Sequence, residues 1–365
     1  MRKLISDRQF FILTMTLALI GITVFASATL GLLARENASV PRNILLQTGL
    51  GFGMGLVALA VLRVVPFSFL RKAAPWLYVA SLILTALVFT PLGAYANGAT
   101  RWIDIGFTTV QPAEFLKIGV VLMLAWWFAP HARTLASPKV GLLPFMLILA
   151  PAVLLLLLQP NTSTTILILT TGTMMYIIAG ARWRDIGILF LIGIIGLGIV
   201  AAERDYVRAR ITTFLSSTED QQGAGYQIKQ SLIAIGSGGF SGKGLGQGVE
   251  KFNYLPEPSG DSVFAVFAEE MGFIGSMLLL TLFVLLAARG FVIAGQASDL
   301  FGGLVAFGLS FLIIFQAFVN MGAMLELIPL TGLPLPFVSH GGTALLTTLA
   351  MCGIILNVAS GRKAS

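Results

Sequence analysis

One carboxylate stands at the border between a polar segment and a long apolar one. Asp261 ends the run Leu255-Pro256-Glu257-Pro258-Ser259-Gly260-Asp261, and a long apolar run begins just beyond it. A carboxylate at the mouth of a membrane cavity could act as a general base. The alternative is that Asp261 caps the N-terminus of the helix that follows.

Two further carboxylates follow on the same predicted helix. Glu269 and Glu270 lie eight and nine residues beyond Asp261, which places them about 12 to 14 Å deeper at 1.5 Å per residue. They are therefore too distant to assist Asp261 directly. We expect them to pair with Lys117 or to fix the packing of helices.

Basic residues in other polar segments, which we expect on the same side of the membrane as Asp261, could bind an anionic group. Arg101 lies beside Trp102, and a guanidinium at the membrane boundary could receive a phosphate. Arg210 and Lys243 lie in the longest polar segment, where Lys243 is surrounded by the glycines of 236–246. These glycines either let backbone amides approach an anion or simply form a turn.

A possible ion pair lies at the start of another apolar segment. The run Gln111-Pro112-Ala113-Glu114-Phe115-Leu116-Lys117 predicts a helix with Pro112 in its first turn. Glu114 and Lys117 are three residues apart, so they share a helix face and can pair. Such a pair within a membrane either ties helices together or belongs to a functional site.

Two polar segments complete this surface. The first, Gln159 to Thr164, reads as a turn that caps the next helix. The second, Thr331 to Gly342, contains two prolines that exclude a regular helix, so we expect an extended or re-entrant element that lines protein or water. Ser339 and His340 lie in it, and for His340 we favour a structural role over metal binding.

Membrane helices must carry these residues. The 365 residues are 56% hydrophobic and 11% charged, with a mean hydropathy of +0.90. A membrane helix needs roughly 20 apolar residues, and the long continuous apolar runs differ from the alternating segments of a barrel. The sequence therefore predicts an all-α polytopic membrane protein. It excludes a soluble nucleic-acid binder, despite the pI of 9.8, and a disulfide scaffold, since Cys352 is the single cysteine.

About ten membrane spans are expected from the apolar runs and the Pro, Gly and charged residues that bound them. They are Phe10–Leu33, Asn43–Val65, Pro75–Gly93, Pro112–Ala129, Gly141–Leu158, Ser163–Gly180, Ile186–Ala202, Ser262–Gly290, Phe301–Met324 and Gly341–Ser360.

The predicted topology gives one membrane domain over 1–365, with a large extracytoplasmic loop at 203–261 between the seventh and eighth spans. An even number of spans puts both termini on the same side. Lys and Arg are concentrated in the tails and short loops of that side, so the positive-inside rule places both termini in the cytoplasm. No internal repeat with a convincing period is present, so the inverted-repeat architecture of many transporters is not supported.

Taken together, these segments resemble the SEDS family of bacterial membrane glycosyltransferases, to which FtsW, RodA and SpoVE belong. The motifs occur in the same order as in the family, from Arg101 to the C-terminus. The sequence of the Pro-rich segment is closer to that of FtsW and SpoVE than to that of RodA. The motifs that carry it are RWIDIG (101–106), QPAEFLK (111–117), QPN (159–161), GYQIKQSLIAIGSGGFSGKGLG (225–246), LPEPSGD (255–261), AEEMGFIG (268–275), VNMG (319–322) and TGLPLPFVSHGG (331–342).

Four segments depart from the family pattern. The family usually has His-Thr-Asp-Phe where this chain has Ser259-Gly260-Asp261-Ser262, so the Asp is kept while its neighbours differ. Asn161 replaces an Asp, His340 replaces a Tyr, and Glu326 stands where a Gly is usual.

The resemblance implies that lipid II is polymerised at the outer face of the bacterial cytoplasmic membrane. It implies Asp261 as the base, with Arg101, Arg210, Lys243 and Lys117 near the diphosphate and Glu114, Gln111 and Ser339 in the same substrate site. A divalent cation, Mg²⁺ or Mn²⁺ and with Asp261 as one possible ligand, would be compatible with this chemistry, whereas a nucleotide cofactor is not needed. The expected partners are lipid II, membrane lipid and a class B penicillin-binding protein, with no nucleic acid. The alternatives are a lipid II flippase or transporter and a non-catalytic scaffold for division or elongation.

Overall fold

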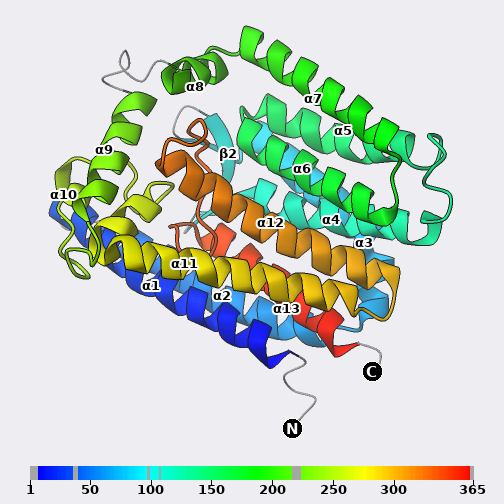
Figure 1. The fold of residues 1–365 in the computed structure, drawn as a ribbon, viewed down its shortest axis with the longest axis horizontal. Coiled ribbons are helices and arrows are strands. Elements are labelled where there is room, and N and C mark those ends of the chain that lie inside the picture. Colours follow the sequence, from blue (N-terminus) through cyan, green and yellow to red (C-terminus); the bar gives the residue numbers. More distant parts are fainter. Residues whose placement is uncertain (1–6, 36–39, 97–98, 107, 216–222, 362–365) are drawn as a thin grey trace.

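The computed structural model describes residues 7–35, 40–96, 99–106, 108–215 and 223–361. The chain forms a bundle of long helices, and the two ends of the chain lie at the same end of it (Figure 1). Helices α8, α9 and α10 gather at the opposite end of the bundle (Figure 1). The helices are α1 (Arg8–Arg35), α2 (Val40–Val64), α3 (Phe67–Ala86), α4 (Pro112–His131), α5 (Leu142–Leu158), α6 (Thr162–Ala179), α7 (Trp183–Glu203), α8 (Asp205–Leu215), α9 (Ala224–Ser237), α10 (Glu250–Asn253), α11 (Val263–Gly295), α12 (Leu300–Met324) and α13 (Gly342–Ser360).

The polytopic all-α prediction is confirmed. Within the described residues, eight helices are long and apolar enough to cross a membrane, and two shorter apolar helices, Gly49–Val64 and Leu142–Leu158, coincide with the remaining predicted spans. The third span is shifted, because α3 begins at Phe67 and encloses Pro75 instead of starting there. Packing against neighbouring helices lets a membrane helix retain a proline that removes one backbone hydrogen bond.

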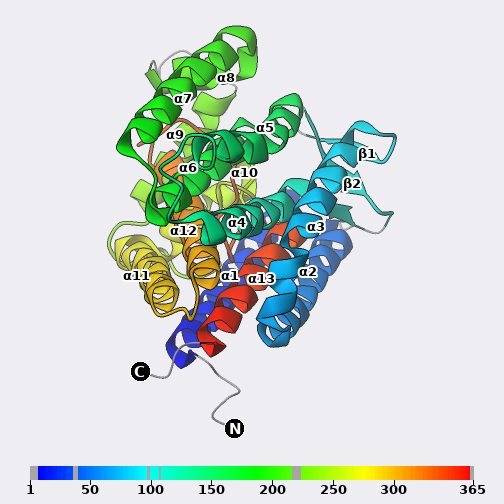
Figure 2. The ribbon, with the colours of Figure 1, turned by 90° about the vertical axis from the view of Figure 1, so that its right-hand side faces the viewer.

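A small sheet lies where the sequence predicted only a helix end and a loop. Strands β1 (Gly93–Ala96), β2 (Ala99–Asp104) and β3 (Thr109–Val110) form an antiparallel sheet in that order. Gly93 pairs with Ile103, and Ile103 in turn pairs with Val110. Figure 2 shows β1 and β2 beside α3 at the edge of the bundle. The sheet therefore holds Arg101 on a strand next to the start of α4.

Glycines allow the closest helix contacts. A Cβ on Gly51 of α2 would lie 2.4 Å from the Cα of Gly342 at the start of α13, and one on Gly353 of α13 would lie 2.7 Å from the carbonyl oxygen of Leu59. Small residues let membrane helices approach in this way. In contrast, α7 contributes Asp185 as its only buried residue and packs mainly against α8.

Two ion pairs dock the glycine-rich loop of 238–249 and the short helix α10 that follows it on α11. Lys251 Nζ lies 2.5 Å from Glu270 Oε1 and 2.8 Å from Ser27 Oγ, and both charged side chains are fully buried. Lys243 Nζ lies 2.7 Å from Glu269 Oε1. The expectation that Glu269 and Glu270 pair with Lys117 is therefore wrong. Their partners lie in this loop and in α10, about twenty residues earlier in the chain. Spacing along one helix does not reveal such pairs.

The loop and α11 fit together through glycine backbones. The helix is kinked at Gly272, which has φ +65° and ψ −164°, a conformation that a side chain would strain. A Cβ on Gly242 would lie 2.1 Å from the carbonyl oxygen of Glu270. These glycines serve the packing of the loop on α11, which corresponds to the turn alternative of the sequence analysis.

Replacing Lys251 with Met should destabilise the protein because the buried Glu270 carboxylate would lose its partner. Removing one member of a buried pair costs about 3 kcal/mol or more. We expect a lower unfolding temperature in detergent than for the matched control Lys229→Met, since Lys229 is exposed. Adding Glu270→Leu to Lys251→Met should recover part of the loss. Equal unfolding temperatures for the two single variants would contradict this assignment.

Glu326 occupies a position that favours glycine. Leu327 N donates to Gly322 O at 2.9 Å and Glu326 N to Ala323 O at 3.3 Å, the hydrogen-bond pattern of a Schellman motif at the end of α12. Glu326 has φ +56°, so it takes the left-handed position of this motif. Glu326→Gly should therefore raise the stability by about 1 kcal/mol, measured as unfolding temperature. Glu326→Ala keeps the Cβ and should give no such gain; a gain of the same size from Ala would assign the strain to the carboxylate instead.

Candidate active site

A polar cavity of about 720 Å³ opens at the end of the bundle that lies away from the termini. It is enclosed by the start of α4, α6 and α13, by α8 and α9, and by the Pro-rich segment after α12. Five of the predicted site residues line it: Arg101, Gln111, Glu114, Arg210 and Asp261. Lys117, Lys243 and Ser339 are not among the lining residues.

Asp261 lines this cavity, and hydrogen bonds hold it in place. Its Oδ1 accepts a hydrogen bond from Gln227 Nε2 at 3.0 Å, and the same nitrogen donates to Ser262 Oγ at 2.8 Å. Asn320 Nδ2 donates to the backbone oxygen of Asp261 at 2.8 Å. Ser262 is the N-cap residue of α11, and no side chain accepts a hydrogen bond there. The helix-cap alternative for Asp261 is therefore wrong, and its carboxylate faces the cavity.

The surroundings of Asp261 make its carboxyl group a stronger base than usual. Burial and, to a smaller extent, the neighbouring charge of Glu257 raise the pKa of Asp261 to about 6. The hydrogen bond from Gln227 and the charge of Arg210 oppose this shift without cancelling it. Asp261 therefore remains mostly ionised at neutral pH while holding a proton more readily than an exposed Asp.

The Pro-rich segment brings Arg210 and Asp261 to the same point. A Cβ on Gly332 would lie 3.6 Å from Arg210 Nη2 and 3.7 Å from Asp261 Oδ2. Gly332 has φ +69°, so both the conformation and the space favour glycine. The segment has no helix between Leu330 and Leu335, which confirms the extended element predicted from its prolines. Arg210 Nη1 donates to the backbone oxygen of Thr331 at 3.1 Å.

Arg101 and Arg210 concentrate positive charge in the cavity. Arg101 Nε donates to the backbone oxygen of Gln159 at 3.3 Å, and its Nη2 donates to that of Pro160 at 2.5 Å. Burial lowers the pKa of Arg101, and the charge of Arg210 lowers it further. Burial also lowers the pKa of Arg210. Two guanidinium groups that repel each other in a partly buried site would be stabilised by an anionic ligand.

The polar turn before α6 connects these groups. Asn161 is the N-cap of α6, and its side chain accepts a hydrogen bond from Thr164 N at 3.4 Å, which confirms the predicted capping turn. Ser163 Oγ donates to the Thr331 oxygen at 2.5 Å, and the hydroxyls of Thr162 and Tyr206 are hydrogen-bonded. The Arg210 guanidinium lies over the Tyr206 ring, 5.7 Å from its centroid.

Glu114 and Lys117 form the predicted pair, with 2.8 Å between Lys117 Nζ and Glu114 Oε2. Both are buried. Lys117 Nζ also donates to Gln316 Oε1 at 2.8 Å, and Thr347 donates to Glu114 Oε2 at 3.1 Å. The pair thus ties α4 to α12 and α13, while Glu114 borders the cavity. Lys117 is therefore paired with Glu114 and is not a free cation in the cavity.

The remaining predicted residues have structural contacts. Lys243 is held by Glu269, as described above. Ser339 Oγ accepts a hydrogen bond from Leu335 N at 2.7 Å, so it stabilises the turn before α13. Gln111 N donates to Thr343 Oγ1 at 3.3 Å. His340 lines the cavity, and its ring stacks on Phe25 with 5.4 Å between centroids, while its Nδ1 is buried without a hydrogen-bond partner.

Sequence reasoning missed three residues that orient the site: Gln227, Asn320 and Tyr206. Gln227 and Asn320 lie inside the motifs GYQIKQ and VNMG. The motifs could therefore have indicated these two residues, whereas residue type alone could not. An uncharged amide carries no chemistry of its own that would single it out. Tyr206 has no comparable signal, because its role depends on α8 folding over the cavity.

Two carboxylates from the loop before α11, Glu257 and Asp261, line the cavity. Among the residues that the structure describes, no three His, Cys, Asp or Glu side chains are grouped as ligands for a metal ion. Two carboxylates nevertheless suit a hard divalent cation that takes its other ligands from water and phosphate.

Comparisons with known proteins agree with this architecture. A family model described as Cell cycle protein, FtsW/RodA/SpoVE, matches residues 7–364. Stage V sporulation protein E of Bacillus subtilis is 39% identical over 307 residues, which cover 84% of each chain. Peptidoglycan glycosyltransferase MrdB of Escherichia coli K12 is 35% identical over 353 residues, 96% of this chain and 94% of that protein.

Solved structures match as well. The rod shape determining protein RodA of Thermus thermophilus superposes with a TM-score of 0.71 at 29% identity and covers 98% of each chain. A chain from a peptidoglycan synthase complex, studied for the coordination of polymerization and crosslinking, gives a TM-score of 0.73 at 30% identity over 93% of this chain and 96% of that one. Relatives named for FtsW match at 35% to 38% identity, which is similar to the identity with MrdB. The closer likeness to FtsW than to RodA, which the Pro-rich segment indicates, therefore stays a prediction. The length of the family match and the identity of these relatives show that this chain belongs to the FtsW/RodA/SpoVE family.

Proposed function

We propose that this protein is a peptidoglycan glycosyltransferase that polymerises lipid II in the polar cavity, with Asp261 as the general base. The observation that carries the proposal is the placement of Asp261 and Arg210 next to the same glycine, Gly332, with Arg101 in the same cavity. Membership of a family whose named members include peptidoglycan glycosyltransferases supports it.

The reaction needs a base on one side of the reacting carbon and positive charge on the other. The Asp261 carboxylate accepts the proton of the acceptor's 4-hydroxyl, whose oxygen then forms a bond to the anomeric carbon of the donor. The bond from that carbon to the diphosphate breaks, and the electron pair leaves with undecaprenyl diphosphate. Arg101 and Arg210 stabilise the negative charge of the departing group. Attack opposite the leaving group inverts the configuration at carbon.

The two loop-side carboxylates, Glu257 and Asp261, would hold a divalent cation if one binds. Such an ion would supply positive charge for the diphosphate. Gln227 and Asn320 orient Asp261, and the buried Glu114–Lys117 pair fixes the start of α4 against α12 and α13.

The cavity faces the extracytoplasmic side in this proposal. Arg8, Arg63, Arg71 and Lys72 lie at the opposite end of the bundle, which the positive-inside rule assigns to the cytoplasm. We also propose a class B penicillin-binding protein as partner. The structural likeness to a chain of a peptidoglycan synthase complex that couples polymerization to crosslinking supports this choice.

Asp261→Asn should abolish polymerisation, because an amide cannot accept the hydroxyl proton. Loss of a general base lowers the rate about 10² to 10⁴-fold. The measurement is glycan strand length on gels after incubation of labelled lipid II with the purified protein, with and without the partner and a divalent cation. Asp205→Asn is the control, since Asp205 is exposed on α8. Polymer formed equally by both variants would remove Asp261 from the chemistry, and transport of lipid II without polymer from the wild type would favour a flippase.

The same assay should show a dependence on pH. Because the pKa of Asp261 is raised to about 6, the active carboxylate is depleted as the pH falls below that value. The rate should be level above about pH 7 and should fall about tenfold per pH unit well below pH 6. A rate that stays level down to pH 4.5 would indicate a base with an ordinary or lowered pKa.

Arg210→Ala should lower the polymerisation rate by about 10² to 10³-fold, the usual cost of removing one group that stabilises developing negative charge. Arg208→Ala is the matched control, because Arg208 is an exposed residue of the same helix. Arg210→Lys should restore only part of the rate, since an ammonium cannot form paired contacts to a phosphate. Equal rates for Arg208→Ala and Arg210→Ala would show that the diphosphate is bound elsewhere.

A further inference from the structure

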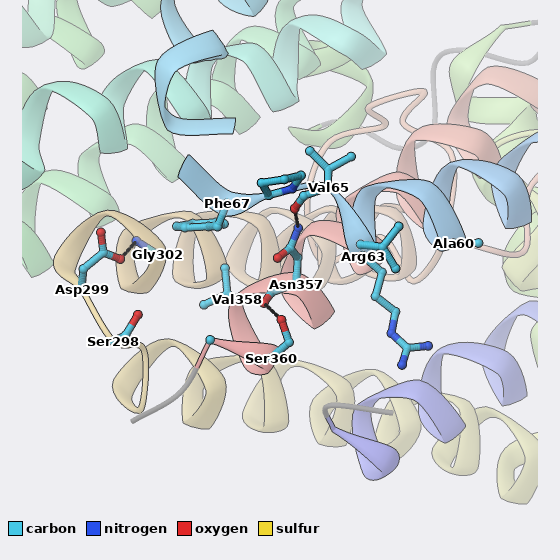
Figure 3. A pocket seen from close by; sticks show the side chains of 13 residues that line it. Ala60, Arg63, Val65, Phe67, Ser298, Asp299, Gly302, Asn357, Val358 and Ser360 are labelled. Atoms are coloured by element: carbon cyan, nitrogen blue, oxygen red, sulfur yellow. Dashed lines mark hydrogen bonds between the residues drawn. The ribbon is translucent and has the colours of Figure 1, made fainter. Parts of the chain in front are cut away.

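A second cavity of about 700 Å³ lies at the end of the bundle that carries the two termini. It is bounded by the connection from α2 to α3, by the start of α12 and by the end of α13 (Figure 3). Its apolar walls come from Ala60, Val64, Phe67 and Val358. The reacting groups of the polar cavity are at the other end of these helices, so this cavity has no part in the chemistry proposed above.

Most polar groups around this second cavity already have partners. Asn357 Nδ2 donates to the backbone oxygens of Leu62 and Val65 at 2.7 and 2.6 Å. Asp299 accepts hydrogen bonds from Gly302 N at 3.0 Å and from Arg71 Nη1 at 3.2 Å. These contacts close the connection between α2 and α3 and cap α12, and they leave little capacity for a ligand.

Arg63 is the exception. Its half-buried guanidinium forms no hydrogen bond or ion pair with any residue that the structure describes, although it lines the cavity. Figure 3 shows Arg63 on the opposite side of the pocket from Asp299, with Asn357 and Val358 between them. The unpaired charged group among the described residues that line the cavity is therefore a cation, which favours an anionic ligand.

An exposed apolar face of α2 reaches the edge of this cavity. One face of the helix exposes side chains at intervals of three and four residues: Leu50 (38%), Met54 (56%), Val57 (62%), Val61 (50%) and Val64 (76%). Val64 also lines the cavity. A ligand with an anionic head at Arg63 and an acyl chain along this face would match both features, whereas a free phosphate would use only the first.

We propose that this cavity binds an anionic phospholipid of the leaflet at the termini end, with its phosphate on Arg63 and one acyl chain along the exposed face of α2. Basic pockets between membrane helices bind anionic headgroups in this way. The neighbouring basic residues Arg8 and Lys72 add positive charge to this end of the bundle, which favours such a lipid, whereas Arg71 is paired with Asp299. Helix α2 would thus contact both the head and the chain of the lipid, and α13 would contribute to the apolar wall of the cavity.

The test measures the unfolding temperature of the full-length protein in detergent while one compound is titrated at a time. The compounds are phosphatidylglycerol, phosphatidylcholine, undecaprenyl phosphate and inorganic phosphate. We expect phosphatidylglycerol to raise the unfolding temperature of the wild type more than the other three compounds do. Because this readout does not use polymerisation, it is independent of the proposed function.

Three variants identify the site. Arg63→Gln should require roughly fivefold more phosphatidylglycerol for half of the effect, as expected for one lost basic contact of about 1 kcal/mol. Ala60→Trp keeps the cation but fills the cavity, so it should also weaken the response. Lys72→Gln removes an exposed charge at the same end that does not line the cavity, and it should respond as the wild type does.

Each other outcome would overturn the proposal. Equal responses to phosphatidylglycerol and phosphatidylcholine would exclude recognition of the anionic head. A response to inorganic phosphate alone would indicate a soluble ligand, and preference for undecaprenyl phosphate would assign the cavity to the carrier lipid. Wild-type titration curves for both Arg63→Gln and Ala60→Trp would place lipid binding at another surface.

Discussion

The amide of Asn320 is the contact on which the arrangement of the site depends. Its Nδ2 donates to the backbone oxygens of Asp261 and Leu333, each at 2.8 Å. One side chain near the end of α12 thereby joins the loop before α11 to the Pro-rich segment before α13. Because buried backbone carbonyls need partners, this amide satisfies two segments that have no regular secondary structure. It brings Asp261 to Gly332, and Arg210 approaches the same glycine from α8.

The supporting contacts show how a membrane protein keeps charged groups inside a bundle. Two buried ion pairs, Glu114–Lys117 and Glu270–Lys251, have further hydrogen bonds, from Thr347 to Glu114 and from Ser27 to Glu270. In a medium of low dielectric constant an unpaired charge would be costly. Pairing therefore allows Lys117 and Lys251 to be buried away from water. Neither lysine lines the polar cavity. Arg101 and Arg210 differ, because they border the cavity and repel each other.

The departures from the family pattern lie at positions with clear local roles. Asn161 retains the helix cap that an Asp would also provide. Glu326 takes a left-handed conformation at the end of α12, which explains why glycine is usual there. The backbone N–H of His340 donates to the oxygen of Ser259 at 2.5 Å, so two of the altered segments contact each other beside Asp261. The contact keeps the loop of Asp261 against the start of α13.

The sequence alone determined the spans, their order and the set of polar segments, because a bilayer requires continuous apolar helices and that requirement is local in the chain. It also indicated Asp261, Arg101 and Arg210 through residue type and motif. It did not reveal that Lys243 pairs with Glu269, that Asp261 does not cap α11, or that Gln227 and Asn320 orient the carboxylate. Those contacts join residues from about twenty to sixty positions apart, and only the folded bundle decides which of several cations lies beside a given carboxylate.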